Sequence, residues 1–126
     1  MKSFWAAIVI AVLLIGGGVL FNKNIDNVTE EMSEREEKIT ALIEKESFDL
    51  AEKEIDELKK YIDNKMIVLA SVIDHKNIDE IELCVAEIEG YTKEKSRFFA
   101  LTKCKELEHL IAHLPVNYSV TLQNIL

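Results

Sequence analysis

The sequence predicts an all-α protein in which an N-terminal transmembrane helix precedes an antiparallel helical bundle. Three observations predict this fold class. Residues 4–21 carry no charged side chain, apolar residues recur every three or four positions from Val28 to Leu114, and no proline lies between Asn22 and Leu114. That spacing is typical of amphipathic helices, and proline is the residue that most often ends one. We therefore expect helices throughout and no sheet.

Composition divides the chain into three parts. Residues 1–25 contain the apolar run and form the expected membrane anchor, whereas residues 26–114 form the expected four-helix domain. Residues 115–126 form a tail whose apolar residues predict that it packs on the bundle: Val116, Tyr118, Val120, Leu122, Ile125 and Leu126. The alternative is that the tail binds a partner as a peptide.

The run Phe4–Phe21 has the length of a membrane-spanning helix. Its 18 residues measure about 27 Å as a helix, close to the roughly 30 Å hydrocarbon core of a bilayer. The alternative is a cleaved secretory signal, whose apolar region is usually about 7 to 15 residues long. Because Gly16–Gly18 are followed by more apolar residues, the sequence favours an uncleaved signal-anchor.

The charges beside this run predict its orientation. Lys2 and the α-amino group precede it, whereas Lys23 follows it alone and is succeeded by acidic residues. Because positive charge resists translocation, we expect a single-pass protein of the cell membrane with a cytoplasmic N-terminus and an extracytoplasmic helical domain. Ala7, Ala11 and the glycines would let two such helices pack closely, which predicts a homodimer through the anchor as an alternative to a single anchor.

The first two helices of the domain differ in their apolar stripes. In the first, which we expect to continue directly from the anchor, the stripe is sparse and Arg35 stands where an apolar residue is expected: Val28, Met32, Ile39, Leu42 and Ile43. The second begins at Ser47, beside the capping pattern Asp49–Glu52, and its stripe is dense: Phe48, Ala51, Ile55, Leu58, Ile62, Met66, Leu69 and Ile73. We expect the second helix to pack more firmly than the first.

Two further helices follow the boundary Asp74–Asn77, where Asn77–Glu80 matches a capping box. Their stripes are Ile78, Ile81, Cys84, Val85, Ile88 and Tyr91 for the third, and Phe98, Phe99, Ala100, Cys104, Leu107, Leu110, Ile111 and Leu114 for the fourth, which Pro115 ends. Gly90 and the polar run Thr92–Ser96 favour a turn between them, the alternative being one long helix.

Four amphipathic helices with short connections predict an up-down bundle, or two αα-hairpins packed together. Residues 42–63 also permit tetratricopeptide-like packing, with residues 46–49 as the turn, although the chain has no 34-residue repeat.

The histidines suggest a metal site. His109 and His113 are four residues apart, a spacing that points both imidazoles to one helix face and suits Zn²⁺. In an up-down bundle the helix ending near His75 would finish beside them, at the membrane-proximal end, where Asp74 could join. A metal-binding sensor or carrier using His75, His109 and His113 is therefore one interpretation. The other is that a histidine in a last helical turn interacts favourably with the helix dipole.

Cys84 and Cys104 are each ten residues from Glu94, at the middle of the predicted turn. An antiparallel hairpin would place them at the same height on two apolar stripes. An extracytoplasmic location would permit a disulfide between Cys84 and Cys104. The alternative is two small core residues, a role that cysteine often has.

Charge and missing motifs exclude several functions. From residue 26 onward, 13 Lys and Arg stand against 23 Asp and Glu, a net charge of −10 that should repel nucleic acid. The sequence has no glycine-rich phosphate loop, no EF-hand loop and no recognisable catalytic arrangement. We therefore expect no enzyme activity and no cofactor.

The chain resembles a family of small bacterial proteins of unknown function that have a membrane segment and an all-helical domain. The resemblance lies in residues 42–51, 73–81, 107–115 and 122–126, although Ser47 and Phe48 stand where relatives often have Gly or Asp and Trp. It implies an origin in Gram-positive, spore-forming bacteria and supplies no catalytic residues. We expect a membrane-anchored interaction or accessory protein of the bacterial cell envelope, whose partners are the lipid bilayer and another membrane or envelope protein.

Overall fold

The computed structural model describes the backbone of residues 2–114 and, except at residues 17–26, 71 and 72, their side chains. This part of the chain contains four helices and no strand: α1 (Lys2–Glu44), α2 (Phe48–Val72), α3 (His75–Lys93) and α4 (Arg97–Ala112). The all-α prediction is confirmed, and so are the separate third and fourth helices. The predicted packing of the tail, residues 115–126, lies outside the described residues.

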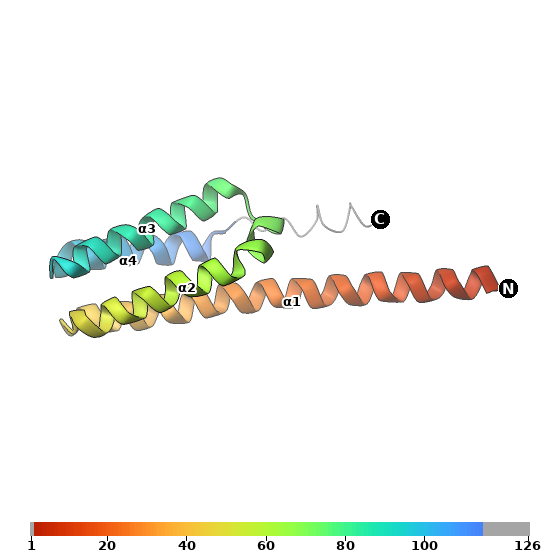
Figure 1. Ribbon diagram of the computed structural model, residues 1–126, viewed down its shortest axis with the longest axis horizontal. Coiled ribbons are helices and arrows are strands. Elements are labelled where there is room, and N and C mark those ends of the chain that lie inside the picture. The colour runs from red at the N-terminus through yellow and green to blue at the C-terminus, as the bar shows by residue number, and fades with distance from the viewer. Residues whose placement is uncertain (1, 115–126) are drawn as a thin grey trace.

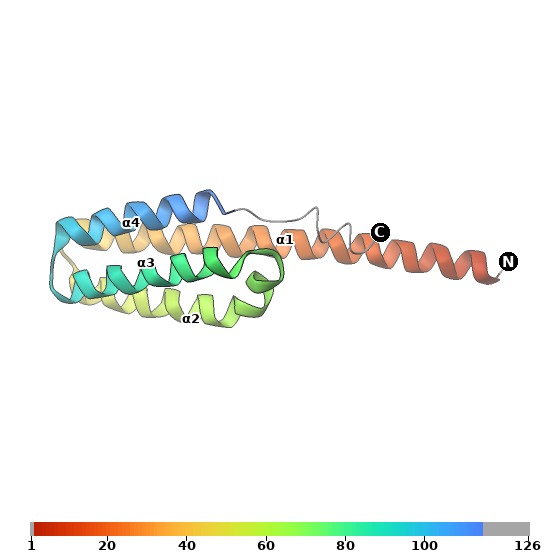
Figure 2. The same cartoon turned by 90° about the horizontal axis from the view of Figure 1, so that it is seen from above.

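The four helices form an up-down bundle (Figures 1 and 2). α1 packs against α2 and α4, and α3 packs against the same two helices, so each helix has two neighbours. The α1–α2 turn (residues 45–47) and the α3–α4 turn (residues 94–96) lie at one end of the bundle, here called the distal end. The α2–α3 turn and the end of α4 lie at the other, proximal end, where α1 leaves the bundle (Figure 1). The predicted pair of hairpins is confirmed.

α1 is one continuous helix of 43 residues, about 65 Å long, and it extends well beyond the bundle (Figure 2). The prediction that the first helix of the domain continues from the apolar segment is therefore confirmed. Among the side chains described, no helix has a stretch apolar and long enough to cross a membrane. The predicted anchor is described only up to Gly16, because the side chains from residue 17 lie outside the described part. The transmembrane helix thus has no support from the described residues.

The core lies where the four apolar stripes meet. The buried apolar side chains of α2 and α3 match the predicted stripes, and those of α1 and α4 match them in part. They are Val28, Met32, Ile39 and Ile43 of α1, Ala51, Ile55, Leu58, Ile62 and Leu69 of α2, Ile73 just after it, Ile78, Ile81, Cys84, Val85 and Ile88 of α3, and Ala100, Cys104, Leu107 and Ile111 of α4.

The position of Arg35 in the α1 stripe was predicted wrongly. Glu36 occupies the core position between Met32 and Ile39, and it is 3% exposed. Arg35 lies beside the stripe, half-buried, with its guanidinium 5.1 Å from the centre of the Tyr61 ring and its Nε 3.0 Å from a Glu31 carboxylate oxygen. A cation over an aromatic face is a stabilising contact, so Arg35 packs the α1–α2 interface rather than weakening it.

Phe98 and Phe99 were wrongly assigned to the core stripe of α4. They are 74% and 52% exposed, while the buried stripe begins at Ala100. Successive helical residues are about 100° apart, which places Phe98 about 200° from Ala100 and so on the opposite face. Position on the helix rather than size decides burial here, since Ala100 is fully buried while both phenylalanines are exposed.

The helix starts are set by backbone geometry rather than by the capping boxes. Ser47 and Asp74 are the N-cap residues of α2 and α3, and neither makes a side-chain capping hydrogen bond. The Asn77 N–H donates to the Asp74 carbonyl oxygen at 3.0 Å, so Asn77 lies within the first turn of α3. α3 therefore begins at the first residues of the predicted boundary Asp74–Asn77, and the Asn77–Glu80 pattern does not cap it.

The two distal turns have the same backbone design. Glu46 and Lys95 adopt the left-handed conformation, with φ of 60° and 58°. In each turn the N–H of the next serine donates to a carbonyl five residues back, Ser47 to Leu42 and Ser96 to Tyr91, both at 2.9 Å. This is the Schellman motif, which satisfies the last carbonyls of a helix. Both hairpins thus close in the same way.

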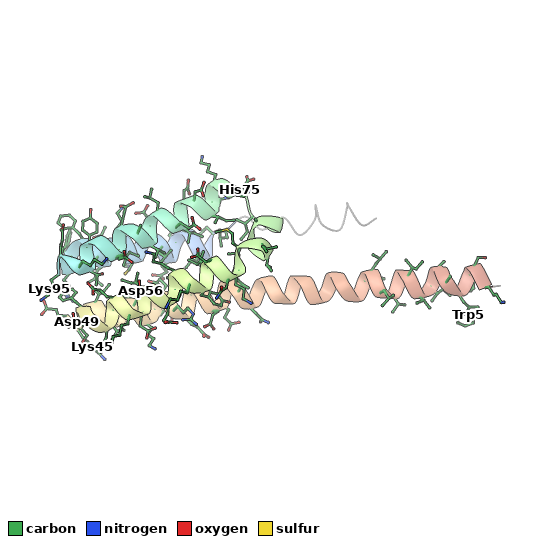
Figure 3. The ribbon with its side chains drawn as sticks, viewed as in Figure 1. Trp5, Lys45, Asp49, Asp56, His75 and Lys95 are labelled. Atoms are coloured by element: carbon green, nitrogen blue, oxygen red, sulfur yellow. The ribbon has the colours of Figure 1, made fainter. Side chains whose placement is uncertain are left out.

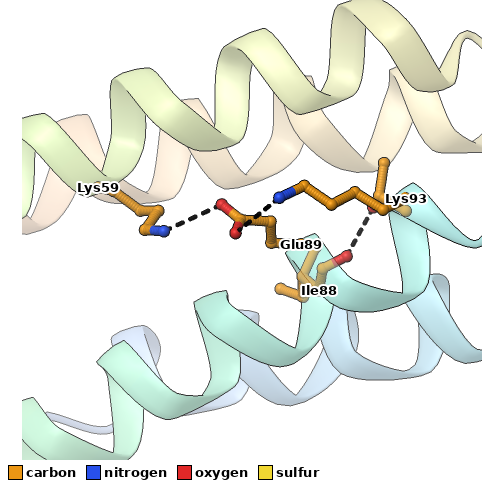
Figure 4. A network of polar contacts seen from close by, with 5 residues as sticks. Lys59, Ile88, Glu89 and Lys93 are labelled. Atoms are coloured by element: carbon orange, nitrogen blue, oxygen red, sulfur yellow. Dashed lines mark hydrogen bonds and ion pairs between the residues drawn. The ribbon is translucent and has the colours of Figure 1, made fainter.

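An ion-pair network joins α2 to α3 on the bundle surface (Figure 4). The Lys59 Nζ donates to one Glu89 oxygen at 3.0 Å, and the Lys93 Nζ lies 3.4 Å from the other. These cations, Lys59 first, lower the pKa of Glu89. Because the lysines are largely exposed, water screens the network and it adds little to stability.

Candidate functional site

The proximal end brings two of the three predicted metal ligands together. The His109 and His113 rings stack with their centres 4.2 Å apart, and the His113 Nδ1 lies 3.1 Å from the His109 carbonyl oxygen. They line a hollow of about 200 Å³ with Asn77, Leu110 and Leu114. The predicted meeting of helix ends at this end of the bundle is therefore correct.

His75 is not part of this arrangement. It is exposed at the start of α3 (Figure 3), while Asn77 is the α3 residue that lines the hollow. Two residues of separation turn a helix by about 200°, so His75 and Asn77 face different ways. Within the described residues, no group of three His, Cys, Asp or Glu side chains is placed to hold a metal ion. The three-histidine site predicted from the spacing is not assembled there.

The two cysteines lie in the core of the α3–α4 hairpin. Cys84 is 2% exposed and Cys104 is fully buried, and both are free cysteines. The Cys84 thiol donates to the Lys103 carbonyl oxygen at 3.2 Å. Burial raises the pKa of Cys84 to about 12 and that of Cys104 to about 11. The placement agrees with the interpretation as small core residues, and the disulfide stays a prediction.

We expect both thiols to be unreactive in the folded chain and both to react once it unfolds. At pH 8 the thiolate fraction is about 10⁻⁴ for Cys84 and about 10⁻³ for Cys104, and only the thiolate attacks a maleimide or Ellman's reagent. Labelling the full chain without reductant, in buffer and in guanidinium chloride, checks this. Two thiols per chain should appear on unfolding; their appearance only after reduction would instead demonstrate the disulfide.

Glu36 is a buried carboxyl group that the sequence did not predict. The Thr40 hydroxyl donates to its Oε1 at 2.7 Å. Burial raises the pKa of Glu36, and the nearby carboxylates of Glu108 and Glu37 raise it further, against the Thr40 hydrogen bond, which lowers it. The signal was available in the spacing, since Glu36 is four residues after Met32 and three before Ile39.

The distal end exposes an aromatic cluster, Tyr91, Phe98 and Phe99. The Tyr91 and Phe99 rings stack with centres 5.4 Å apart, and the Phe98 ring meets Phe99 edge-on at the same distance. Arg97, between them in sequence, donates from Nε to the Glu44 carbonyl oxygen at 3.3 Å. Because Glu44 is the last residue of α1, this bond ties the two distal turns together.

The distal end also carries an open depression of about 480 Å³, here called the distal hollow. It is lined by Glu46, Ser47, Phe48, Asp49, Leu50 and Lys95. Figure 3 shows Lys45, Asp49 and Lys95 gathered at this end of the bundle. The hollow therefore joins the α1–α2 turn to the residue at the centre of the α3–α4 turn.

One of three comparisons with known proteins gives a match. A family model described as a domain of unknown function (DUF4363) matches residues 19–125. No curated protein and no solved structure matches the chain. The match agrees with the expected membership of an uncharacterised family and supplies no residue with an assigned role.

Proposed function

Because the chain belongs to the DUF4363 family, whose description names no function, we propose its function from the residues themselves: it is a membrane-anchored helical accessory protein of the bacterial cell envelope. In this proposal α1 crosses the membrane once, with a cytoplasmic N-terminus. The bundle stands outside the membrane and contacts another envelope protein without catalysing a reaction.

The observation that carries the proposal is the exposure of the apolar part of α1. Its nine large hydrophobic side chains from Phe4 to Ile15 are each between 40% and 68% exposed. Burying apolar surface is worth about 25 cal/mol per Å², so such a segment is unfavourable in water and calls for an apolar covering. The charge-free run continues in sequence to Phe21, which is long enough for the covering to be a bilayer.

The continuity of α1 gives the proposal a mechanical consequence. The helix that carries the exposed apolar residues also supplies Met32, Ile39 and Ile43 to the core. A bundle held in this way is presented at a fixed distance and angle from the membrane surface, which suits a module that positions or braces a partner.

A charge placed in the apolar segment should detach the protein from membranes. The Leu13→Arg substitution should lower the fraction that stays in the pellet after an alkaline carbonate wash, because an arginine near the centre of a spanning helix costs about 2.5 to 3.5 kcal/mol on insertion scales. Leu83→Arg is the matched control, because Leu83 is an exposed leucine of the bundle. An unsubstituted chain in the soluble fraction, or equal retention of both variants, would contradict anchoring.

Orientation and partner need separate measurements. Alkaline phosphatase fused to the C-terminus should be active, and a fluorescent protein that folds only in the cytoplasm should be dark. The reverse result would contradict the extracytoplasmic bundle. Crosslinking in membranes of the native host should then yield a defined adduct with another envelope protein, and its absence would count against the accessory role.

A further inference from the structure

The two turns at the distal end carry opposite charges. Residues 44–50 contain three carboxylates and one lysine, a net charge of −2, whereas residues 93–99 contain two lysines, one arginine and one glutamate, a net charge of +2. In the part of the chain that the structure describes, neither Lys45 nor Lys95 forms an ion pair with another side chain. The distal end is thus divided into an acidic half and a basic half.

The same division applies to shape. The basic half bears the exposed aromatic cluster, with Phe98 74% exposed. The acidic half supplies most of the wall of the distal hollow, including Glu46, Asp49 and Leu50, and Leu50 is 53% exposed. One half therefore projects an apolar group between cations. The other offers a depression in which Phe48 and Leu50 lie between carboxylates, with Lys95 also in its wall.

We propose that a second copy of this chain docks end to end on the distal end. A two-fold axis between the copies would place the aromatic cluster of each over the distal hollow of the other, so that each basic half faces an acidic half. A two-fold interface requires a surface that is complementary to itself, and a surface divided in this way meets that requirement. Phe98 then lies against Leu50 of the second copy, and Lys95 near Glu46 and Asp49.

The charge of the domain favours this occupant and this geometry. At −10 over residues 26–126, two copies repel each other if they pack side by side, and an anionic lipid surface repels either one. Contact at the distal end, where the charges of the two turns cancel, keeps the acidic flanks well separated, and repulsion between exposed charges fades beyond about 8 to 10 Å at physiological salt.

The size of the patch predicts a weak association. A fully exposed aromatic side chain offers about 150 to 250 Å², so the exposed parts of Phe98, Phe99 and Leu50 supply about 300 to 400 Å² per copy. Stable complexes bury about 800 Å² per partner. We therefore expect a dimer that forms in the micromolar to millimolar range. The apolar segment of α1 lies at the opposite end (Figure 1). The two segments of the pair therefore point in opposite directions and, under the anchoring proposed above, enter two facing membranes.

The first test measures self-association of the full chain in detergent by sedimentation velocity over a concentration series. Phe98→Ala should weaken the dimer about tenfold or more, as loss of a central aromatic contact does. Leu83→Ala is the matched control, because Leu83 is 62% exposed on the flank of α3, and it should change the dissociation constant by less than about twofold. Circular dichroism confirms that both variants are folded.

Charge reversal distinguishes specific docking through the distal end from nonspecific hydrophobic association. Lys95→Glu and Glu46→Lys should each weaken the dimer, and the two together should restore much of the affinity, because the opposed charges are exchanged on both copies. Added salt should weaken the dimer of the unsubstituted chain.

Crosslinking tests the geometry. When the Lys95→Cys and Glu46→Cys variants, carrying tags of different size, are mixed and oxidised, the covalent dimer should contain one of each; the buried Cys84 and Cys104 should not interfere. Ser3→Cys should not crosslink to itself, because end-to-end pairing holds the two N-termini far apart. Dimers linked only through residue 3 would overturn the proposal and support association through the apolar segment. A chain monomeric into the millimolar range would also overturn it, as would equal effects of Phe98→Ala and Leu83→Ala.

Discussion

Replacing Leu58 by alanine is expected to lower the free energy of unfolding of the full chain by about 2 to 5 kcal/mol. Leu58 is 1% exposed and belongs to the core cluster formed by all four helices. The substitution removes buried apolar surface and leaves a cavity that well-packed neighbours fill only in part. In a domain whose total stability is about 5 to 15 kcal/mol, that loss is a large fraction.

The measurement is urea unfolding of the full chain in mild detergent, followed by far-UV circular dichroism. Leu83→Ala is the control, because it removes the same atoms from a leucine that is 62% exposed on α3. It should change the stability by no more than about 0.5 kcal/mol. Equal losses from the two substitutions would mean that α2 is not packed in the core as described.

Where an apolar stripe is dense and one-sided, the sequence was sufficient to predict the helix and its buried face. In α2 every predicted stripe residue is buried or packed against the core. From Glu52 to Lys65 the other faces carry mainly charged residues, so only one face of the helix can be the buried one. The turn at residues 94–96 was also predictable, because a polar run separates two such stripes.

The stripe of α4 shows where this reasoning fails. Apolar residues lie on both of its sides near the distal end, so the period alone does not distinguish Phe98 from Ala100. The choice depends on the space between α1, α3 and α4, which only the packed bundle defines. Glu36 was missed for the opposite reason, because a carboxylate is assumed to face water unless a partner such as Thr40 is known.

The sequence was sufficient to predict the level of the candidate site residues along the bundle, but not the direction in which their side chains point. Bundle topology correctly brought the ends of α2 and α4 together, and the four-residue spacing correctly paired His109 with His113. Whether His75 faced them depended on where α3 begins. The predicted boundary Asp74–Asn77 spans nearly a full helical turn, and the point within it where α3 begins determines which α3 residue lines the hollow.

The features of the distal end could not be predicted from single residues, because they depend on which segments the fold brings together. Residues 44–50 and 93–99 are separated by more than 40 positions, and the Arg97 bond to the Glu44 carbonyl holds them side by side. Exposed aromatic residues are expensive to leave in water, and they lie at the end of the bundle furthest from the exposed segment of α1 (Figure 1). The protein therefore exposes apolar side chains at both of its ends, and the acidic four-helix bundle lies between them.

Replacing Glu36 by methionine is expected to raise the free energy of unfolding at pH 8 by about 1 to 3 kcal/mol. An ionised carboxylate in the α1–α4 interface loses its favourable hydration, and the single hydrogen bond from Thr40 offsets only part of that loss. The pH dependence follows from the raised pKa of Glu36. A group whose pKa is higher in the folded state contributes its stability fully below its unfolded pKa, near 4.5. That contribution is lost as the pH rises through the higher folded pKa. The advantage of the methionine variant should therefore grow from pH 4 upward.

Glu36→Gln tests the same cause without changing the shape of the side chain. Glutamine is neutral at every pH and its carbonyl still accepts the Thr40 hydrogen bond, so subtracting its stability curve from that of the unsubstituted chain isolates the ionisation of Glu36. Glu34→Gln is the control, because Glu34 is an exposed carboxylate on the same helix. Its curve should run parallel to that of the unsubstituted chain. If the Glu36→Gln curve runs parallel as well, Glu36 does not titrate in the core, and α1 meets α4 through a more hydrated interface than its 3% exposure indicates.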